Sequence, residues 1–545
     1  MMPASRQSGE PSSGMRYASG GGQPEELRGF GETSLWTVLG TVVPGIGLLR
    51  AGRRLAGGVV LALFAIGVVG IGLGALAFWN VLGSQRRDQV AQLALDPNNL
   101  YAAAAALLVV ALGWVAVVTT THLALRTSPA TAVERVAGGV LVGVLSFAVA
   151  APLALGANYA YISGSAISTI FGGGDTDGTP PPTGADPWAG TDRLNILILG
   201  GDSGVKSHRS TSVGARTDTV MVASIDTHTG ATTLITMPRN AEQMPFPPDS
   251  PLRKYYPNGF VSPKPNPSLF ERSQYLLNAM YRNIPAQVPN NVLGKTKDFG
   301  ASVMMQSVGY ALGLDIDYYV FVNMDGFKDF INAIGGITVN VNYAVPVGGH
   351  NASPPYPEQK PESWIEPGPN QLLKGGYALW FARGRYHLDD YSRMERQRCV
   401  VYAVTQQTTP ATVLANYQAI AATGEKNITT NIPRTLLPAM AELGLKVKGT
   451  KTRSLVLDPS SGFRSYAPDW NWVRAKVKKA LNETAASATP PPSASTTPNA
   501  PASSSSPAAS SSSSPSSSPT AKPTKSDDLS VVCSYHPKDY KPTKR

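Results

Sequence analysis

Residues 195–203 read Asn-Ile-Leu-Ile-Leu-Gly-Gly-Asp-Ser, a short apolar run that ends in two glycines and an aspartate. Such a run is typical of a buried strand that carries a polar side chain at its carboxyl end. Two further apolar runs, at residues 219–225 and 232–237, predict two more strands. Residues 226–231, which include Gly230, predict the hairpin that joins them. The sequence therefore predicts a sheet that starts with this run.

Helix-like and strand-like segments alternate after the hairpin. Apolar residues recur at helical spacing over residues 299–314, and Gly335-Gly336 is a helix stop signal before another short strand. Because each face of a sheet must be buried, this order predicts an α/β domain, an α-β-α sandwich, over residues 191–482. The other expected elements are strands at 318–323 and 337–341, and helices at 326–334, 393–407, 410–423, 432–445 and 469–481.

The first third of the chain is dominated by long apolar stretches. Residues 55–79, 100–125 and 136–161 each exceed the roughly 20 apolar residues that a membrane-spanning helix needs. A fourth stretch, residues 35–49, is shorter and is interrupted by proline and glycine. This fourth stretch either spans the membrane, lies in the interface or re-enters. The sequence thus predicts a multi-span helical membrane region over residues 34–161.

Basic residues in the loops predict the orientation of this region. Arg50, Arg53 and Arg54 precede the first clear span, and Arg126 and Arg135 precede the last one. Because cytoplasmic loops are enriched in lysine and arginine, both loops are expected inside the cell. We therefore expect a multi-pass protein of the cell membrane whose globular domain is extracytoplasmic.

The remaining segments read as tails and linkers. Residues 1–33 and 483–526 have the composition of disordered chain, residues 162–190 that of a linker, and residues 527–545 form a short basic segment. Much of the net charge of +11 lies in this segment and in the membrane-proximal loops, so we expect no nucleic-acid partner. For Cys399 and Cys533 two interpretations stay open: a disulfide that tethers the tail, or a small buried apolar residue at position 399.

Arginines are concentrated before and within the predicted helix 393–407. Arg383 and Arg385 are two residues apart and would face the same way on a strand or an extended segment. Arg393, Arg396 and Gln397 share one helix face. Guanidinium groups this close repel each other unless an anion or carboxylates compensate them, and arginine binds phosphate through a planar fork. The alternative is a solvated charged helix with surface ion pairs.

Aspartates stand at two predicted strand ends. Asp202 follows the first strand, and Asp218 stands at the start of the second. If the two strands are neighbours, both carboxylates lie at one end of the sheet, which suits Mg²⁺ with phosphate oxygens. The alternative is ordinary turn chemistry, because aspartate is common where strands begin and end. Arg239 adds another guanidinium at the end of the third strand.

Taken in order, these segments resemble the LytR-CpsA-Psr family of cell-wall ligases. The resemblance covers about residues 193–408 of this sequence. It rests on Asn195-Ile-Leu-Ile-Leu-Gly-Gly-Asp202-Ser203, Arg216-Thr-Asp-Thr219, Pro238-Arg239, Asp317-Tyr-Tyr-Val-Phe-Val-Asn-Met-Asp-Gly326-Phe327, Gly335-Gly-Ile-Thr-Val339, Ala378-Leu-Trp-Phe-Ala-Arg383-Gly-Arg385 and Asp390-Tyr-Ser-Arg393-Met-Glu-Arg396-Gln397.

The resemblance implies a phosphotransferase that moves a glycan-phosphate from a polyprenyl-pyrophosphate carrier in the membrane lipid onto peptidoglycan. It implies an apolar tunnel for the polyprenyl tail, and Mg²⁺ near Asp202 and Asp218. It implies catalytic roles for Arg239, Arg383, Arg393 and Asp390, of which Asp390 would orient an arginine. The residues that it places at the pyrophosphate are Arg216, Arg239, Arg383, Arg385, Arg393, Arg396 and Gln397.

Two other functions stay open at this point, a polyprenyl-pyrophosphate hydrolase and a non-catalytic polyprenyl-lipid-binding or regulatory protein. The sequence also departs from the family pattern. Asn240 stands where the family usually has aspartate, Leu276 replaces a lysine, and residues 241–275 read as an insertion. These departures concern the acceptor side, so the sequence does not identify the glycan.

Overall fold

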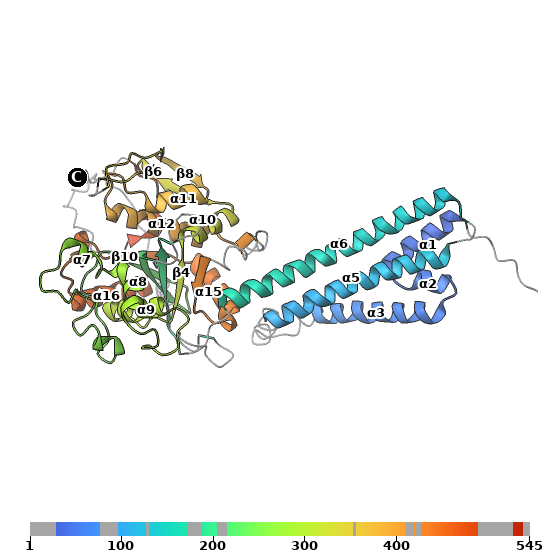
Figure 1. The fold of residues 1–545 in the computed structure, drawn as a ribbon, viewed down its shortest axis with the longest axis horizontal. Helices are drawn as coiled ribbons and strands as arrows, with labels where there is room; N and C mark the ends of the chain where they lie inside the picture. Colours follow the sequence, from blue (N-terminus) through green and yellow to red (C-terminus); the bar gives the residue numbers. More distant parts are fainter. Residues whose placement is uncertain are drawn as a thin grey trace, which may run out of the picture. The chain divides into compact units, whose positions relative to one another are not determined.

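The computed structural model of the 545-residue chain describes residues 29–76, 96–126, 130–171, 187–188, 190–203, 215–352, 356–409, 412, 416, 419–420, 427–488 and 527–537. The described residues belong to two compact units, which Figure 1 draws in one ribbon. The first unit lies within Met1–Trp79 and Ala106–Gly156, and the second within Asn80–Ala105 and Ala157–Arg545. Each unit is considered by itself below.

Three helices are long and apolar enough to cross a membrane, as predicted. They are α3 (Arg54–Leu76), α5 (Pro97–Leu125) and α6 (Ala132–Phe171). Most of their apolar side chains are exposed, which is the pattern of a surface that faces lipid and not water. The stretch at 35–49 is divided between α1 (Phe30–Val42) and α2 (Ile46–Arg50), and each of these is too short to span.

The last apolar helix corrects the predicted linker. α6 continues beyond residue 161 to Phe171, because this extension buries Ala166 and Ile167 and places Phe171 against a core cluster with Trp188 and Leu194. Small serine and glycine residues gave the segment the composition of a linker, although its apolar residues keep a helical spacing. Residues 172–186 of the predicted linker lie outside the described residues, as do residues 1–28 of the predicted N-terminal tail.

A seven-stranded mixed sheet organises the second unit, in the order β11-β10-β3-β2-β1-β4-β9. The predicted hairpin is present, because β2 and β3 pair in antiparallel register on either side of residues 227–231. The first strand pairs with β2 on one side and runs parallel to β4 on the other. The strands are β1 (Arg193–Gly201), β2 (Thr217–Asp226), β3 (Thr232–Met237), β4 (Tyr318–Val322), β9 (Ile428–Thr430), β10 (Thr452–Val456) and β11 (Asp527–Asp528).

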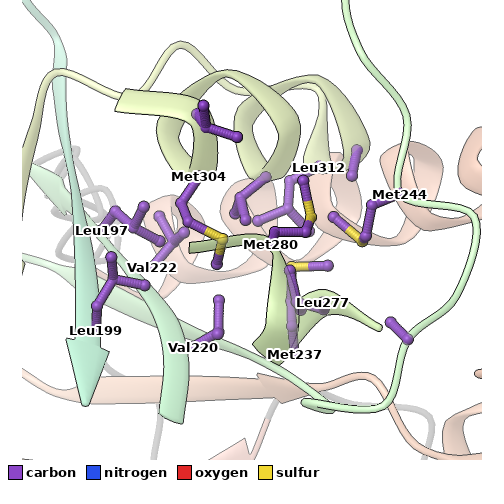
Figure 2. Close-up of a cluster of buried hydrophobic side chains, with 14 of the residues drawn as sticks. Leu197, Leu199, Val220, Val222, Met237, Met244, Leu277, Met280, Met304 and Leu312 are labelled. Carbon is purple, nitrogen blue, oxygen red and sulfur yellow. The ribbon is translucent and has the colours of Figure 1, made fainter. Parts of the chain in front are cut away.

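Helices lie on both faces of this sheet (Figure 1). One group, formed by α8 (Leu277–Gln287), α9 (Phe299–Leu312) and α16 (Trp470–Ala488), packs on one face. Figure 2 shows its core, in which Leu197 and Val222 of the sheet meet Met280 and Met304. Because successive side chains of a strand point to opposite faces, Met221 and Leu234 pack on the other face against α12 (Asp390–Gln407).

The remaining elements surround this sheet or cap its ends. The strand predicted at 337–341 forms a separate two-stranded sheet with β8, and β6 pairs with β7 in another. The predicted helix near 410–423 lies mostly outside the described residues. These other elements are α7 (Leu269–Ser273), α10 (Met324–Ala333), β5 (Ile337–Val341), β6 (Val345–Val347), β7 (Ser363–Ile365), β8 (Gly368–Leu373), α11 (Gly375–Arg383), α15 (Leu437–Lys448), α17 (Leu529–Val532) and the 3₁₀ turns Pro251–Lys254, Arg434–Leu436 and Pro459–Ser461.

Residues 527–537 of the predicted short basic C-terminal segment pack against this unit. Its two-residue strand β11 pairs with β10, and Leu529 is fully buried beside Met221 and Leu234. A disulfide joins Cys533 to Cys399 on α12, so the first of the two cysteine interpretations is confirmed. Residues 489–526, nearly all of the predicted Ser/Pro/Ala-rich tail, lie outside the described residues, and α16 extends to Ala488.

Candidate active site

A cavity of about 1340 Å³ lies between the sheet and the helices α10, α11 and α12. One part of its lining is apolar, and the other part carries arginines and aspartates. The apolar side chains are those of Ile198, Val320, Phe330, Leu379, Val400, Val404 and Ile428. The charged side chains are those of Asp202, Asp218, Arg239, Glu362, Arg383, Arg385, Asp389, Asp390 and Arg393. Such a lining suits an amphiphile with a long apolar part and an anionic head.

Asp202 and Asp218 lie at the same end of the sheet, as the prediction required of neighbouring strands. β1 and β2 are paired up to Gly200 and Gly201, so the residues that follow β1 meet the start of β2. The backbone N–H of Arg216 donates to Asp202 Oδ1 at 2.8 Å, which fixes the loop end. Only glycine fits at position 201, because a Cβ there would lie 2.3 Å from the Phe321 ring.

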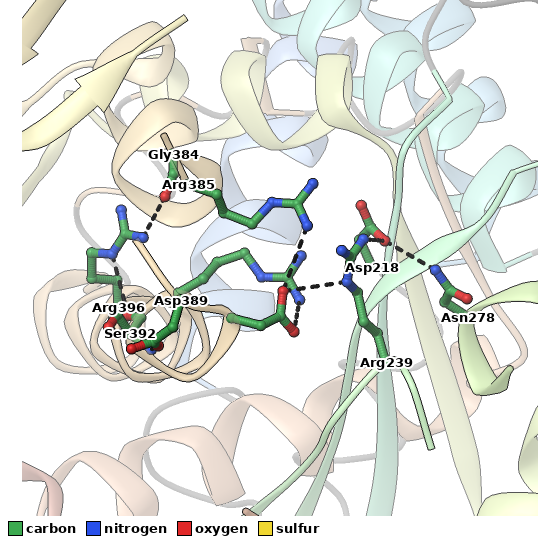
Figure 3. A network of polar contacts seen from close by, with 10 residues as sticks. Asp218, Arg239, Asn278, Gly384, Arg385, Asp389, Ser392 and Arg396 are labelled. Carbon is green, nitrogen blue, oxygen red and sulfur yellow. Dashed lines mark hydrogen bonds and ion pairs between the residues drawn. The ribbon is translucent and has the colours of Figure 1, made fainter. Parts of the chain in front are cut away.

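Asp218 is held by two side chains (Figure 3). Arg239 Nη1 donates to Asp218 Oδ1 at 2.7 Å, and Asn278 Nδ2 donates to the same oxygen at 3.3 Å. Burial alone would raise the pKa of the Asp218 carboxyl, but attraction to Arg239, then to Arg393, lowers it to about 2. The carboxylate is therefore anionic at any physiological pH.

Asp390 is shared by three arginines. Its carboxylate lies 3.0 Å from Arg393 Nη2, 3.3 Å from Arg239 Nε and 3.6 Å from Arg385 Nη1. Together with Asp218 this places three guanidinium groups and two carboxylates in one network of ion pairs.

Arg393 is the most deeply buried charged group of this site, with a side chain that is 2% exposed. Its Nε atom is buried and has no hydrogen-bond partner among the described residues, although the residue lines the cavity. Burial lowers the pKa of Arg393 to about 10, so the guanidinium stays charged at neutral pH. A buried donor without an acceptor is unfavourable, so this position of Arg393 costs stability.

Arg383 and Arg385 both line the cavity, but the prediction that they share a strand is wrong. Arg383 is the last residue of α11, and its guanidinium lies over the Trp380 ring, 4.8 Å from the centroid. Arg385 follows in the loop before α12, and its Nη1 lies 3.6 Å from Asp390 Oδ1. Gly384 follows the last residue of α11 and separates the two arginines. The apolar residues before Arg383 recur at helical spacing and not at the alternating spacing of a strand.

Arg396 and Arg216 are not among the residues that line the cavity, in contrast to the pyrophosphate role expected of them. Arg396 is 4% exposed and donates to the carbonyl oxygens of Phe381, Gly384 and Ser392, so it holds the loop between α11 and α12 (Figure 3). Arg216 donates to Gln274 Oε1 at 2.9 Å. The sequence could not reveal that these guanidinium groups donate their hydrogen bonds to oxygens of the protein itself.

Gln397 and Arg398 lie on different sides of α12. Gln397 lines the cavity one turn after Arg393, as the shared helix face predicts. Arg398 points away from that face and donates from Nη1 to Ser454 Oγ of β10 at 2.7 Å. The shared face of α12 thus presents Arg393 and Gln397 to the cavity, while Arg396 is directed to the backbone.

The two strand-end aspartates fit a magnesium ion that needs ligands from its substrate. Both line the cavity, and Asp218 is ionised. Within the part of the chain that the structure describes, no group of three or more acidic, His or Cys side chains forms a metal cluster. Mg²⁺ is commonly held by one or two carboxylates together with waters and substrate phosphates, so this donor set is compatible with it.

Asn278 was absent from the residues assigned to the site by sequence. It is 5% exposed, contacts Asp218, and its Oδ1 is buried without a partner among the described residues. Asn278 and Tyr281 keep the family's spacing after the position where Leu276 replaces a lysine, and this spacing was the available signal. Tyr281 stacks on Phe321 and donates to Asp298, so it supports the sheet end from the opposite face.

The sequence of this chain is similar to a known family and to several known proteins. The LytR_cpsA_psr family matches residues 178–461, more than half of the chain. A polyisoprenyl-teichoic acid–peptidoglycan teichoic acid transferase TagU of Enterococcus faecalis is 27% identical over 242 residues, 44% of this chain and 61% of that protein. Biofilm regulatory protein A of Streptococcus mutans is 32% identical over 135 residues, 24% of this chain and 32% of that protein.

The chain thus spans less than two thirds of the length of these curated relatives. Among solved structures, B. subtilis TagV is 23% identical with a TM-score of 0.35, covering 55% of this chain and 99% of that one. The family match covers every strand of the sheet except β11, together with the cavity and the charged cluster described above. The chain belongs to the LytR-CpsA-Psr family.

Proposed function

We propose that the protein transfers a glycan-phosphate from a polyprenyl-pyrophosphate carrier onto peptidoglycan. The observation that carries this proposal is a single cavity in which an apolar wall adjoins a cluster of arginines and aspartates. A polyprenyl-pyrophosphate has the same two parts, an apolar tail and an anionic head. Relatives named as teichoic acid transferases support the class of reaction.

The apolar wall would hold the polyprenyl tail. Ile198 and Val320 face the cavity from the sheet, and Val400 and Val404 face it from α12, one turn apart. Burying a prenyl chain there gains roughly 25 cal/mol for each Å² of apolar surface. Binding energy from a tail that does not react helps to position the head group.

The guanidinium groups would hold the pyrophosphate. Arg239, Arg385 and Arg393 all line the cavity and contact Asp390. A peptidoglycan hydroxyl oxygen forms a bond to the glycan-bearing phosphorus as that phosphorus loses its bond to the bridging oxygen. Polyprenyl phosphate leaves with the bonding electrons, and the hydroxyl proton passes to solvent. Charge that builds on the bridging oxygen is stabilised by the arginines.

Asp202 and Asp218 would hold Mg²⁺, which when bound neutralises charge on the phosphate oxygens. The carboxylate of Asp218 needs no proton removed before it binds a cation, because its pKa is about 2. Arg239 shares this carboxylate, so Asp218 would connect the cation site with the arginine cluster.

The three apolar helices and the family membership support a membrane-anchored protein. We further propose that the domain after α6 is extracytoplasmic. Basic residues in the loops before α3 and α6 support this orientation. The disulfide between Cys399 and Cys533 also supports it, because disulfides persist in oxidising compartments and are rare in the cytosol. Substrates of this reaction, the lipid carrier and peptidoglycan, are present on that side.

The proposed donor is tested by mass spectrometry of lipids that co-purify with the full chain in mild detergent. We expect polyprenyl phosphates or pyrophosphates with wild-type protein, and much less of them with Val400→Trp, which fills the apolar wall. The matched control is Val531→Trp on α17, an exposed valine outside the cavity lining. Equal phospholipid-only spectra for all three proteins would contradict the proposal.

A further inference from the structure

One side of the cavity is formed by the β6–β7 hairpin and by the loop between α11 and α12. The hairpin pairs from Val345↔Ile365 to Val347↔Ser363, and a further bridge joins His350 to Gln359. β6 lies beside α11 (Figure 1). Residues of both segments line the cavity next to the arginine cluster, among them Asn351, Tyr356, Tyr386 and His387.

This side carries aromatic rings that are open to solvent. Tyr356 is 68% exposed and Trp364 is 42% exposed. Tyr386 meets the Trp364 ring edge to face with centroids 6.2 Å apart, and the His387 ring lies 4.2 Å from Tyr386. Exposed aromatic rings gathered at the edge of a cavity mark a binding surface more often than a packing accident. We call Tyr356, Trp364, Tyr386 and His387, with Glu358 and Asn351, the aromatic rim; Trp364 and Glu358 do not line the cavity themselves but contact Tyr386 and His387, which do.

Hydrogen bonds join the two segments of the aromatic rim. Glu358 Oε1 lies 2.9 Å from His387 Nε2, and the backbone N–H of His387 donates to Asn351 Oδ1 at 3.0 Å. Hydrogen bonds from Tyr386, then from His387, lower the pKa of the Glu358 carboxyl, so it stays ionised. His387 adopts a left-handed backbone conformation with φ 51°, which is uncommon for a residue other than glycine. These contacts hold the rings in a fixed arrangement.

The aromatic rim is tied directly to the phosphate-binding cluster. Tyr386 follows Arg385, which contacts Asp390. Arg396 holds the Gly384 carbonyl through Nη2 at 2.5 Å, and a side chain at position 384 would lie 2.5 Å from the Pro346 carbonyl oxygen. A group that is attached to the pyrophosphate and extends toward this side of the cavity would therefore contact the aromatic rim.

We propose that the aromatic rim binds sugar rings beside the reacting phosphate, and this rests on the proposed function. Sugar rings expose C–H faces that pack on aromatic side chains, and their hydroxyls donate to carboxylate and amide oxygens such as those of Glu358 and Asn351. With the tail on the apolar wall and the phosphates on the arginines, the sugar is the part left to occupy this side. The aromatic rim gives specificity for a saccharide and takes no part in the transfer of the phosphate.

Three titrations of the full chain in detergent test this inference. They use sugar-free polyprenyl pyrophosphate, the same lipid carrying its glycan, and a soluble peptidoglycan disaccharide fragment. The rim variants are Tyr356→Ala, Trp364→Ala and Glu358→Gln, and the control is Tyr377→Ala, an exposed tyrosine of α11 outside the cavity lining. We expect the rim variants to weaken binding of a sugar-bearing ligand by about tenfold, which corresponds to about 1.4 kcal/mol.

The pattern among the three ligands identifies the source of the sugar. Loss confined to the glycan-bearing lipid assigns the rim to the donor, and loss confined to the disaccharide assigns it to the acceptor. In both cases sugar-free lipid and the Tyr377→Ala control bind as before. Unchanged binding of both sugar-bearing ligands in all rim variants overturns the inference. Failure of the proposed function looks different, because wild-type protein would then not bind the sugar-free lipid.

Discussion

Two carboxylates and three guanidinium groups form the charged centre of the cavity. Asp390 lies between Arg239, Arg385 and Arg393, while Asp218 is held by Arg239. Each carboxylate neutralises part of the repulsion among the arginines and orients their remaining N–H groups. The residues are thus preorganised for an anion before it binds, which is the condition for strong electrostatic stabilisation of a reacting phosphate.

At the scale of single residues, the lowered pKa of Asp218 predicts a pH-dependent contribution to stability. Its folded pKa is about 2, below the usual value of 3.8, so the stabilisation is complete above pH 4 and is lost as the pH falls toward 2. Because the side chain is partly exposed, we expect about 1–2 kcal/mol. Thermal unfolding of Asp218→Asn from pH 8 to pH 3 should show a lowered Tm whose deficit shrinks below pH 4.

The control for this measurement is Asp249→Asn, an exposed carboxylate away from the cavity. It should follow the wild-type curve over the whole range. A Tm deficit of Asp218→Asn that persists unchanged to pH 3, or grows there, would show that the ion pair with Arg239 is not what lowers this pKa.

Arg393 is predicted to act on the reacting phosphate. Arg393→Ala should lower turnover by about two orders of magnitude or more, a few kcal/mol of lost transition-state stabilisation. Arg393→Lys should recover only part of this, because an ammonium group lacks the planar fork. The measurement is kcat for transfer of a labelled glycan, with Arg474→Ala on α16 as the control. Full activity of Arg393→Lys would exclude a bidentate role.

At the scale of elements, α12 determines which arginines reach the cavity. The helix begins at Asp390 because Asp389 caps it, accepting a hydrogen bond from the Ser392 N–H at 2.6 Å. From this start, Arg393 and Gln397 face the cavity and Arg396 faces the preceding loop. The loop end of α11 therefore depends on Arg396, and the aromatic rim depends on the same loop.

Arg396 is accordingly predicted to be a positioning residue. Arg396→Ala leaves the buried carbonyls of Phe381 and Gly384 without their donor, which costs about 1–3 kcal/mol of stability. We expect a Tm lower by several degrees together with reduced turnover. Arg393→Ala should lower the Tm as well, because its side chain is 2% exposed and paired with Asp390. Calorimetry of Arg396→Ala measures the loss of stability, and the transfer assay measures the loss of turnover. An unchanged Tm for Arg396→Ala would contradict this assignment.

The elements that could be predicted from sequence are those with a strong period. The runs at 195–200 and 232–237 became β1 and β3, and the spacing over 299–314 became α9, because apolar periodicity records burial directly. Asp202 and Asp218 could be placed at strand ends because the apolar runs beside them show where the strands end and begin. The two-residue strand β11 could not, since it is too short for a period and depends on the disulfide and on Leu529.

The sequence predicted which residues lie at the candidate site better than it predicted what those residues contact. Sequence gathered Arg239, Arg383, Arg385 and Arg393 correctly at one cavity, since motif order carries over between relatives. It could not show that Arg396 serves backbone carbonyls, because partners of a long flexible side chain depend on tertiary packing. The aromatic rim was also missed, since its residues are far apart in sequence and follow no period.

At the scale of the whole molecule, the membrane region is predicted to place the globular unit outside the cell. An alkaline phosphatase fusion after Phe171 should be active, and one after Arg126 should be inactive, because the basic loop before α6 is retained inside. A cytoplasmic fluorescent reporter at the same two positions should give the reverse pattern. Phosphatase activity after Arg126 but not after Phe171 would invert the orientation and exclude peptidoglycan as the acceptor.

The account as a whole depends on transfer to peptidoglycan, and one assay tests this directly. The full chain is incubated with a polyprenyl-pyrophosphate-linked glycan labelled in the sugar, Mg²⁺ and a peptidoglycan fragment. Wild-type protein should attach the label to the fragment through a phosphodiester, and Asp202→Ala should abolish this attachment at every magnesium concentration. Label released as free phosphorylated glycan at the same rate with and without the fragment would identify a hydrolase and contradict the account.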